Sequence, residues 1–243
     1  MATNVSVILK FSDGTMTYLR DDVTENTLTE VQTDASGILN ITANVSAGQF
    51  AQGKICIAAV AKVQTDNATT GAFGYAAFYG PQGNVLGAIQ GGGMAVSGVP
   101  LLKRPIRMTT GIQVKVFWQA VADAVQYASL AVYCASGKTD IYNVLAVDGV
   151  ATSILNKDGN SLGESLVGEN VLCGYATYSA SNGLADTGIA DGIGAFYVED
   201  SNGQLVAMFP PSQGAHHSGD PVPWIEQPFR VNQNMTLTVT ANV

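Results

Sequence analysis

The sequence predicts an all-β protein built from two tandem eight-stranded jelly-roll (β-sandwich) domains that arose by internal duplication, with a Greek-key sandwich as the alternative topology of each domain. Three observations lead to this prediction. Apolar and polar residues alternate with a period of two along most of the chain. Turn-forming Gly, Asp and Asn residues separate the alternating segments. Segments of the first half also recur in the second half about 116 to 123 positions later.

The first repeat begins with a hairpin, because residues 5–11 and 15–19 flank the dipeptide Asp13-Gly14, which favours a tight turn. We expect further strands around residues 27–32, 38–45, 54–63, 72–79, 85–90 and 112–120. Helical periodicity is weak throughout the chain. The best helix candidates are short turns near residues 120–126 and in the long loops.

The second repeat continues the series, with strands expected around residues 129–134, 140–147, 152–155, 170–179, 193–198, 204–209 and 235–243. The boundary near Ala122 and Asp123 divides the chain into domains 1–122 and 123–243. Two long stretches rich in Gly and Pro, 90–104 and 210–227, are expected to be exposed connections without strands.

The duplication depends on matched segments. The clearest match sets Ala77-Phe78-Tyr79 against Ala195-Phe196-Tyr197, each followed by a Gly turn and an apolar strand. Pro105-Ile106-Arg107 and Pro228-Phe229-Arg230 each lead into an alternating strand. Weaker matches join Ile55-Cys56 to Leu172-Cys173, residues 11–14 to 133–137, and residues 37–40 to 153–156.

The composition is poor in charge. Apolar residues make up 47% of the chain, charged residues only 12%, and the mean hydropathy is +0.18, whereas a typical soluble domain is about one-quarter charged. The longest apolar runs, such as residues 55–61, are far shorter than the roughly 20 residues of a membrane-spanning helix. Subunit interfaces would explain the excess, because interface cores are depleted in charge.

The net charge of −8 argues against general or direct sequence-specific nucleic-acid binding, which favours a basic stripe. The one dense basic cluster, Lys103, Arg104 and Arg107, is expected to be a solvated loop or a subunit contact. Residues 1–122 carry eight basic and seven acidic residues, but residues 123–243 carry three basic and twelve acidic ones. The two repeats are therefore expected to face different surroundings in an assembly.

Cys56, Cys134 and Cys173 are an odd number without CxxC spacing, so we expect buried thiols rather than disulfides or zinc ligands. Residues 1–7 enter a strand pattern at once, so no secretion signal is expected.

The sequence predicts no catalytic, cofactor-binding or metal-binding residues. The only histidines, His216 and His217, are adjacent in a loop, where Ser218 and Asp220 would complete a formal Ser-His-Asp set. No GxSxG motif surrounds a serine, so an exposed polar loop is the preferred interpretation.

Other candidate sites have simpler explanations. The pairs Asp186/Asp191 and Asp200/Asn202 lack calcium-loop spacing and fit turns, although a calcium ion shared between subunits stays an open alternative. Neighbouring carboxylates are expected to be solvated. Gly91–Gly93 has no following helix to bind phosphate. Single tryptophans are usually core or interface residues. The residues concerned are Asp21, Asp22, Glu199, Asp200, Gly91, Gly92, Gly93, Trp118 and Trp224.

The pattern resembles the double jelly-roll major capsid proteins of tailless icosahedral viruses, in which two tandem eight-stranded jelly rolls form one subunit. The repeated segments that begin at Ala77, Ala195, Pro105 and Pro228 carry the resemblance. It implies a homotrimer of pseudo-sixfold symmetry that contacts neighbouring capsomers and possible minor capsid or membrane proteins. It also implies synthesis in the host cytoplasm and a location in the virion, often above an internal membrane.

Two other classes stay open. A carbohydrate-binding tandem β-sandwich would hold sugars with Trp, Tyr and Asp or Asn side chains of the long loops. A viral tail-tube or decoration subunit would form rings or bind a preformed shell. An enzyme ranks last, because no proton carrier or nucleophile has a visible partner.

Overall fold

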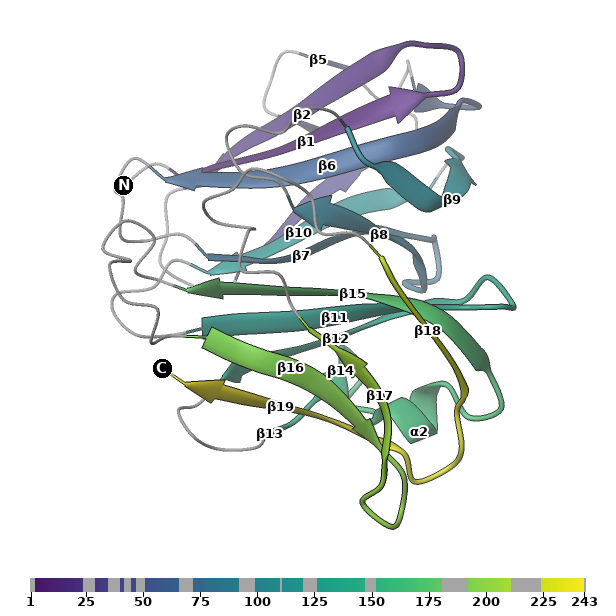
Figure 1. The fold of residues 1–243 in the computed structure, drawn as a ribbon. Coiled ribbons are helices and arrows are strands. Elements are labelled where there is room, and N and C mark those ends of the chain that lie inside the picture. Colours follow the sequence, from purple (N-terminus) through teal and green to yellow (C-terminus); the bar gives the residue numbers. More distant parts are fainter. Residues whose placement is uncertain are drawn as a thin grey trace.

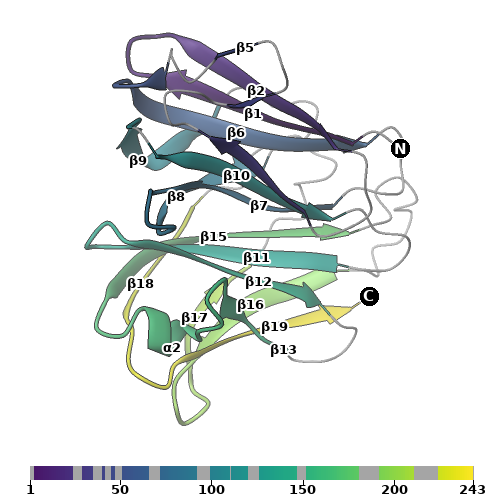
Figure 2. The same cartoon turned by 180° about the vertical axis from the view of Figure 1, so that it is seen from behind.

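The computed structural model describes residues 3–23, 29–34, 40–41, 45–46, 51–65, 72–91, 99–109, 111–119, 126–146, 152–180, 192–210 and 224–242. They form an all-β structure with curled sheets, in agreement with the predicted β-sandwich class. The sheets lie in four successive layers, which we number sheet 1 to sheet 4 from the N-terminal end, and both views show the same layer order (Figures 1 and 2).

Sheets 1 and 2 belong to the first half of the chain. Sheet 1 has the strand order β2 (Met16–Val23), β1 (Thr3–Phe11), β6 (Ile55–Thr65), β9 (Leu101–Arg107). Sheet 2 has the order β8 (Val85–Gly91), β7 (Ala72–Tyr79), β10 (Gln113–Gln119), β3 (Thr29–Asp34). A short parallel pairing of β6 with β8 joins them into one curled eight-stranded sheet. The strands β4 (Asn40–Ile41) and β5 (Val45–Ser46) pair separately.

Sheets 3 and 4 belong to the second half. Sheet 3 has the order β14 (Leu155–Asn156), β12 (Thr139–Ala146), β11 (Gln126–Cys134), β15 (Asn170–Ala180), β18 (Ile225–Arg230). Sheet 4 has the order β13 (Thr152–Ser153), β19 (Thr236–Asn242), β16 (Gly192–Glu199), β17 (Leu205–Phe209). A short helix, α2 (Leu162–Ser165), precedes β15.

The strand order of the first half recurs in the second. Sheet 1 (β2-β1-β6-β9) matches the β12-β11-β15-β18 part of sheet 3, and sheet 2 (β3-β10-β7-β8) matches sheet 4 (β13-β19-β16-β17). The opening hairpins also close alike. Gly14 N–H donates to the Phe11 carbonyl, and Gly137 N–H donates to the Cys134 carbonyl, so the segments 11–14 and 134–137 correspond at a shift of 123.

Hydrogen-bond register corrects two of the letter matches. Gly83 N–H donates to Gly80, and Gly203 N–H donates to Asp200, so the β7–β8 and β16–β17 turns correspond at a shift of 120. Phe78 therefore corresponds to Val198, and the identical Ala-Phe-Tyr letters lie two residues out of register. In the same way Phe11 pairs with Cys56 and Cys134 pairs with Val171, so Cys56 corresponds to Val171 and not to Cys173.

Each half encloses its own apolar core, one between sheets 1 and 2 and the other between sheets 3 and 4. The largest buried side chains of the first core include Phe11, Phe78 and Ile89. Those of the second core include Phe196 and Phe209. Alternation along each strand sends every second side chain into these cores, as the period-two pattern predicted.

Several element predictions were wrong in detail. The single strand expected at 38–45 is two short strands, β4 and β5. The connections 90–104 and 210–227 were expected to lack strands, but β9 and β18 begin within them. Both strands carry a proline, which the edge position of a sheet tolerates because one side needs no backbone donor. The helix α2 was not predicted.

Other predictions fall outside the described residues. The helix candidate near 120–126 and the boundary at Ala122 lie almost wholly there, as does most of the 37–40 segment. The division into domains 1–122 and 123–243 stays a prediction. Within the described part of the chain, no helix is long and apolar enough to cross a membrane.

Candidate functional site

The two halves meet through sheets 2 and 3, and we call this packing the central contact. Strand β7 packs against β11 and β15, and β8 packs against β12. Its side chains are mostly aromatic or alanine: Tyr75, Ala77, Tyr79, Val85 and Ala88 from sheet 2, and Ala131, Ile141, Tyr175 and Trp224 from the second half. Fully burying a large apolar side chain contributes roughly 1.5–3 kcal/mol, so this third apolar cluster binds the halves firmly.

Residues of the central contact also form hydrogen bonds. The Gly91 N–H donates to the Tyr175 hydroxyl at 2.9 Å, and the Tyr175 ring lies 5.9 Å from the Trp224 ring between centroids. Burial raises the pKa of Tyr175 well above its usual range, so the phenol stays neutral. The hydroxyls of Tyr75 and Tyr79 lie 3.3 Å apart.

The central contact stacks unlike sheets on each other. Sheet 3 is the counterpart of sheet 1 and sheet 4 is the counterpart of sheet 2, so the two types of sheet alternate through the four layers. The contact is therefore head-to-tail. The outer faces of sheets 1 and 4 are the counterparts of the two faces that meet in the middle.

A salt bridge spans the halves at the edge of the central contact. Lys103 Nζ lies 2.6 Å from Glu226 Oε1, and the hydrogen bond to this carboxylate raises the pKa of Lys103. Lys103 lies in a bulge of β9, where residues 102–105 stand between the positions paired with Cys56 and Ala58. Both partners are partly exposed, so the pair contributes at most about 1 kcal/mol.

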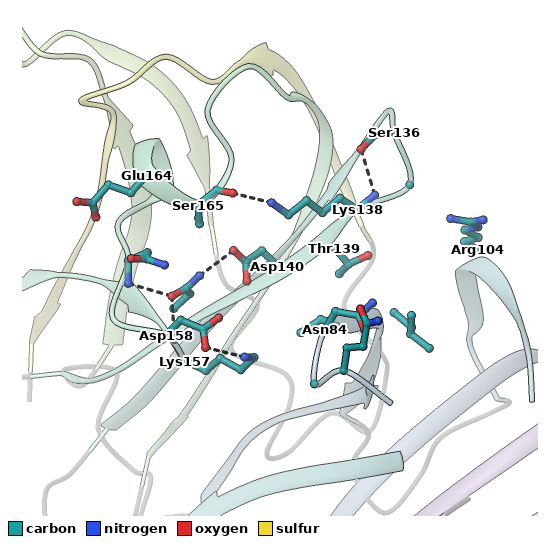
Figure 3. A pocket seen from close by; sticks show the side chains of 17 residues that line it. Asn84, Arg104, Ser136, Lys138, Thr139, Asp140, Lys157, Asp158, Glu164 and Ser165 are labelled. Carbon is teal, nitrogen blue, oxygen red and sulfur yellow. Dashed lines mark hydrogen bonds and ion pairs between the residues drawn. The ribbon is translucent and has the colours of Figure 1, made fainter. Parts of the chain in front are cut away.

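A pocket of about 780 Å³ opens beside the central contact, between the β7–β8 turn and the second half (Figure 3). Arg104 approaches it from one side and Lys157 and Asp158 lie on the other. The lining is polar: Gln82, Gly83, Asn84, Val85, Leu86, Arg104, Ser136, Gly137, Lys138, Thr139, Asp140, Asn156, Lys157, Asp158, Asn160, Glu164 and Ser165. Three cations face three carboxylates, so the pocket carries no net charge.

The pocket wall contains a buried polar network centred on Asp140. Its carboxylate accepts hydrogen bonds from the Tyr142 hydroxyl at 3.1 Å and from Asn156 Nδ2 at 3.0 Å. Tyr142 also hydrogen-bonds the Ser165 hydroxyl, and Lys138 Nζ donates to the Ser165 carbonyl at 2.6 Å. The network ties α2 and β14 to β12.

This network is suited to holding elements together and does not activate Ser165. Burial, and then the nearby Asp140 carboxylate, raise the pKa of Tyr142 well above its usual range. The phenol therefore stays protonated beside Ser165, and a protonated phenol cannot take the proton of a nucleophilic hydroxyl.

Thr139 stands out in the pocket wall. It is 4% exposed, and among the described residues its Oγ1 is the one buried side-chain N or O atom without a hydrogen-bond partner. Its hydroxyl points toward the side of the pocket where Arg104 lies (Figure 3). An unsatisfied buried hydroxyl costs about 1–3 kcal/mol.

The cysteines are buried and free. Burial raises the pKa of Cys56 and that of Cys134 to about 12, and it also raises the pKa of Cys173. These thiols are small core side chains, as predicted, and they are poor nucleophiles. Among the described residues, no three His, Cys, Asp or Glu side chains gather into a possible metal site.

The structure describes few of the other sequence candidates. His216, His217, Ser218, Asp220, Asp186, Asp191, Gly92 and Gly93 lie outside the described residues, as do the side chains of Asp21, Asp22 and Trp118. Asp200 accepts backbone N–H bonds from Asn202 and Gln204, which is turn chemistry, and these bonds lower its pKa. The basic cluster Lys103, Arg104 and Arg107 is exposed on β9 and not on a loop.

Sequence reasoning placed Trp224 correctly among core or interface residues, but it missed Thr139, Asp140, Tyr142 and Ser165. Comparison with family models, with curated proteins and with solved structures gives no match. The stacking of the sheets and the chemistry of the exposed faces are the observations that bear on function.

Proposed function

We propose that this chain is a viral structural protein, a double jelly-roll major capsid protein whose trimers assemble an icosahedral shell. The observation that carries the proposal is the head-to-tail central contact between two halves of the same strand order. A shell subunit needs repeated packing of this kind more than it needs a reaction centre.

The strand order supports two jelly rolls. A jelly roll is a closed pair of four-stranded sheets linked by Greek-key connections. Sheets 1 and 2 have four strands each, and every strand of the order β2-β1-β6-β9 and β3-β10-β7-β8 pairs antiparallel with its neighbours. In a conventional jelly roll the first and last strands lie side by side. Here β1 and β2 would occupy those two positions, joined by their hairpin turn.

The head-to-tail order supports a closed ring. A heterologous contact, in which one face binds a different face, generates a ring when the rotation closes. Each chain contributes two stacked halves, so three chains place six similar halves around one axis. This gives the trimer of pseudo-sixfold symmetry that the resemblance implies.

The composition fits an assembled state. The described residues leave large apolar side chains exposed on the outer faces of the end sheets, among them Met16, Tyr18, Leu205 and Met208. Contiguous exposed apolar groups mark interaction surfaces. The glycan-binding alternative loses one of its aromatic candidates, because Trp224 packs against Tyr175 in the central contact.

The test is the mass of the purified protein by light scattering after size-exclusion chromatography, followed by negative-stain images of the main peak. A stable trimer with a hexagonal outline is expected. A clean monomer that binds glycans on an array would overturn the proposal in favour of a carbohydrate-binding module. Rings of another symmetry would instead indicate a tail-tube or decoration subunit.

A further inference from the structure

We propose that the outer face of sheet 1 in one copy of the chain packs against the outer face of sheet 4 in another copy, repeating the central contact between chains. This inference rests on the proposed function, because it names the surfaces that join the subunits of the assembly. The residues of the central contact have counterparts at both ends of the stack, on the outer faces of sheets 1 and 4.

The outer face of sheet 1 keeps an apolar surface at the matching positions. Ala131 and Ile141 pair with each other across β11 and β12, and Ile8 and Tyr18 pair in the same way across β1 and β2. Tyr18 is 56% exposed and Ile8 is half-buried, with Met16 exposed beside them. The counterpart of the buried Ile141 is thus an aromatic side chain open to solvent.

The outer face of sheet 4 also has apolar residues at the positions that match the central contact. Ala88 pairs with Ala77 across β8 and β7, and Met208 pairs with Tyr197 across β17 and β16. Met208 is 42% exposed and Tyr197 is half-buried. Leu205, the counterpart of the interface residue Val85, is 57% exposed.

Size is redistributed between the inner and outer faces. Where the central contact has Ala77, Ala88 and Ala131, the outer faces have Tyr197, Met208 and Ile8. Where the central contact has Tyr75 and Tyr175, the outer faces have Ala195 and Val60. Ala195 and Val60 are buried within the chain, so the large side chains that the outer faces leave partly open to solvent stand where the central contact has alanine.

The strand contacts predict which residues meet. Because β12 packs against β8 inside the chain, β2 of one copy should pack against β17 of the next copy. Tyr18 is the exposed counterpart of Ile141 and Met208 is the exposed counterpart of Ala88, so these two residues are expected to lie together at the contact between chains.

Single charge substitutions test the surfaces, because both side chains are exposed and the monomer should tolerate the change. Tyr18→Glu and Met208→Glu are each expected to weaken association by roughly 30-fold, the loss typical of a central interface residue. The matched control is Val167→Glu, because Val167 is equally exposed and lies outside both faces. It should leave the trimer intact.

Cross-linking tests the pairing directly. A chain carrying Tyr18→Cys and Met208→Cys, treated with a short bifunctional maleimide, should give covalent dimers and trimers, while either single variant should not. The native thiols are buried and do not compete.

The outcomes separate the two proposals. A wild-type monomer defeats the proposed function itself. This inference is overturned if the wild-type chain is a trimer, both glutamate variants are also trimers, and the double-cysteine chain gives no covalent dimers or trimers. Other surfaces would then join the subunits.

Discussion

The packing of Gly174 against Phe209 offers a sharp test of the correspondence between the halves. A Cβ added at Gly174 would lie 2.6 and 2.7 Å from two ring carbons of Phe209 and 3.2 Å from Leu130 Cδ1. Phe209 is fully buried and its ring packs against Phe229, with centroids 6.5 Å apart, so it has little room to move. Gly174→Ala is expected to lower the free energy of unfolding by about 1–3 kcal/mol.

The first half has a different pair of residues at the positions that correspond to Gly174 and Phe209. Leu9 pairs with Ala59 as Val132 pairs with Gly174, so Ala59 is the counterpart of Gly174. At the shift of 120 found for the β7–β8 and β16–β17 turns, Ile89 is the counterpart of Phe209. The first half thus has alanine beside isoleucine where the second half has glycine beside phenylalanine.

A double-mutant cycle turns this exchange into a measurement. Phe209→Ile alone should cost about 2 kcal/mol, because it leaves unfilled volume in the second core. In Gly174→Ala with Phe209→Ile, the new methyl group fills space that the smaller side chain vacates. The double variant should lose at least about 1 kcal/mol less than the sum of the single losses.

The assay is urea unfolding of the four proteins followed by far-UV circular dichroism, at one protein concentration because assembly also stabilises the chain. Ala59→Gly in the first half is the matched control and should cost only about 0.5–1 kcal/mol, since it relieves no clash. Additivity within about 0.5 kcal/mol would refute the reasoning, because the two side chains would then not share one space.

Three further results are expected. Thr139→Val should raise the free energy of unfolding by about 1 kcal/mol in calorimetry by removing the unsatisfied hydroxyl, and Thr139→Ser should not. Cys56 and Cys134, each with a pKa near 12 because of burial, should react with a thiol reagent at pH 8 only after denaturation, and rapid labelling of the native protein would contradict this. The pKa of Asp13 should be about 2 by NMR titration because the Thr15 hydroxyl and N–H donate to it. Its folded pKa lies below the ordinary value of 3.8, so its contribution to stability is present above about pH 4 and is lost toward pH 2, and Thr15→Val should raise the pKa.

Local turn chemistry made the hairpins predictable. Asp13-Gly14 sits at the β1–β2 turn, where Gly14 has a φ of +85°, a conformation that glycine adopts without strain. The capping box of α2 was equally visible, because Ser161 and Glu164 have the required spacing. A four-residue helix is too short to show periodicity, so this signal stood alone and was missed.

Residue letters were a weaker guide to register. The Ala-Phe-Tyr match was wrong by two positions, yet it kept the correct face because strand side chains repeat every two residues. Phe78 and Phe196 are both buried in the cores, although the identical letters misalign them. Hydrogen bonds across the turns decided the register, and a sequence does not display them.

The candidate site depended on information that no single strand contains. Asp140 and Thr139 lie in the pocket wall only because the β7–β8 turn of the first half reaches the second half. Tyr175 and Gly91 meet across 84 positions for the same reason. The excess of apolar residues signalled that surfaces would be covered, but the choice of surfaces follows from the stacking order of the sheets.

The bulge in β9 shows how the inner and outer contacts can differ although the strands correspond. Four residues of β9 stand between the positions paired with Cys56 and Ala58, but only two residues of β18 stand between those paired with Val171 and Cys173. The extra residues carry Lys103 to Glu226, so the salt bridge belongs to the contact within the chain. A contact between chains made by the same strands would lack this bulge on the β18 side and would depend on apolar packing. Apolar burial is less sensitive to salt than an exposed ion pair is, so association between chains should persist at ionic strengths that screen the Lys103–Glu226 pair.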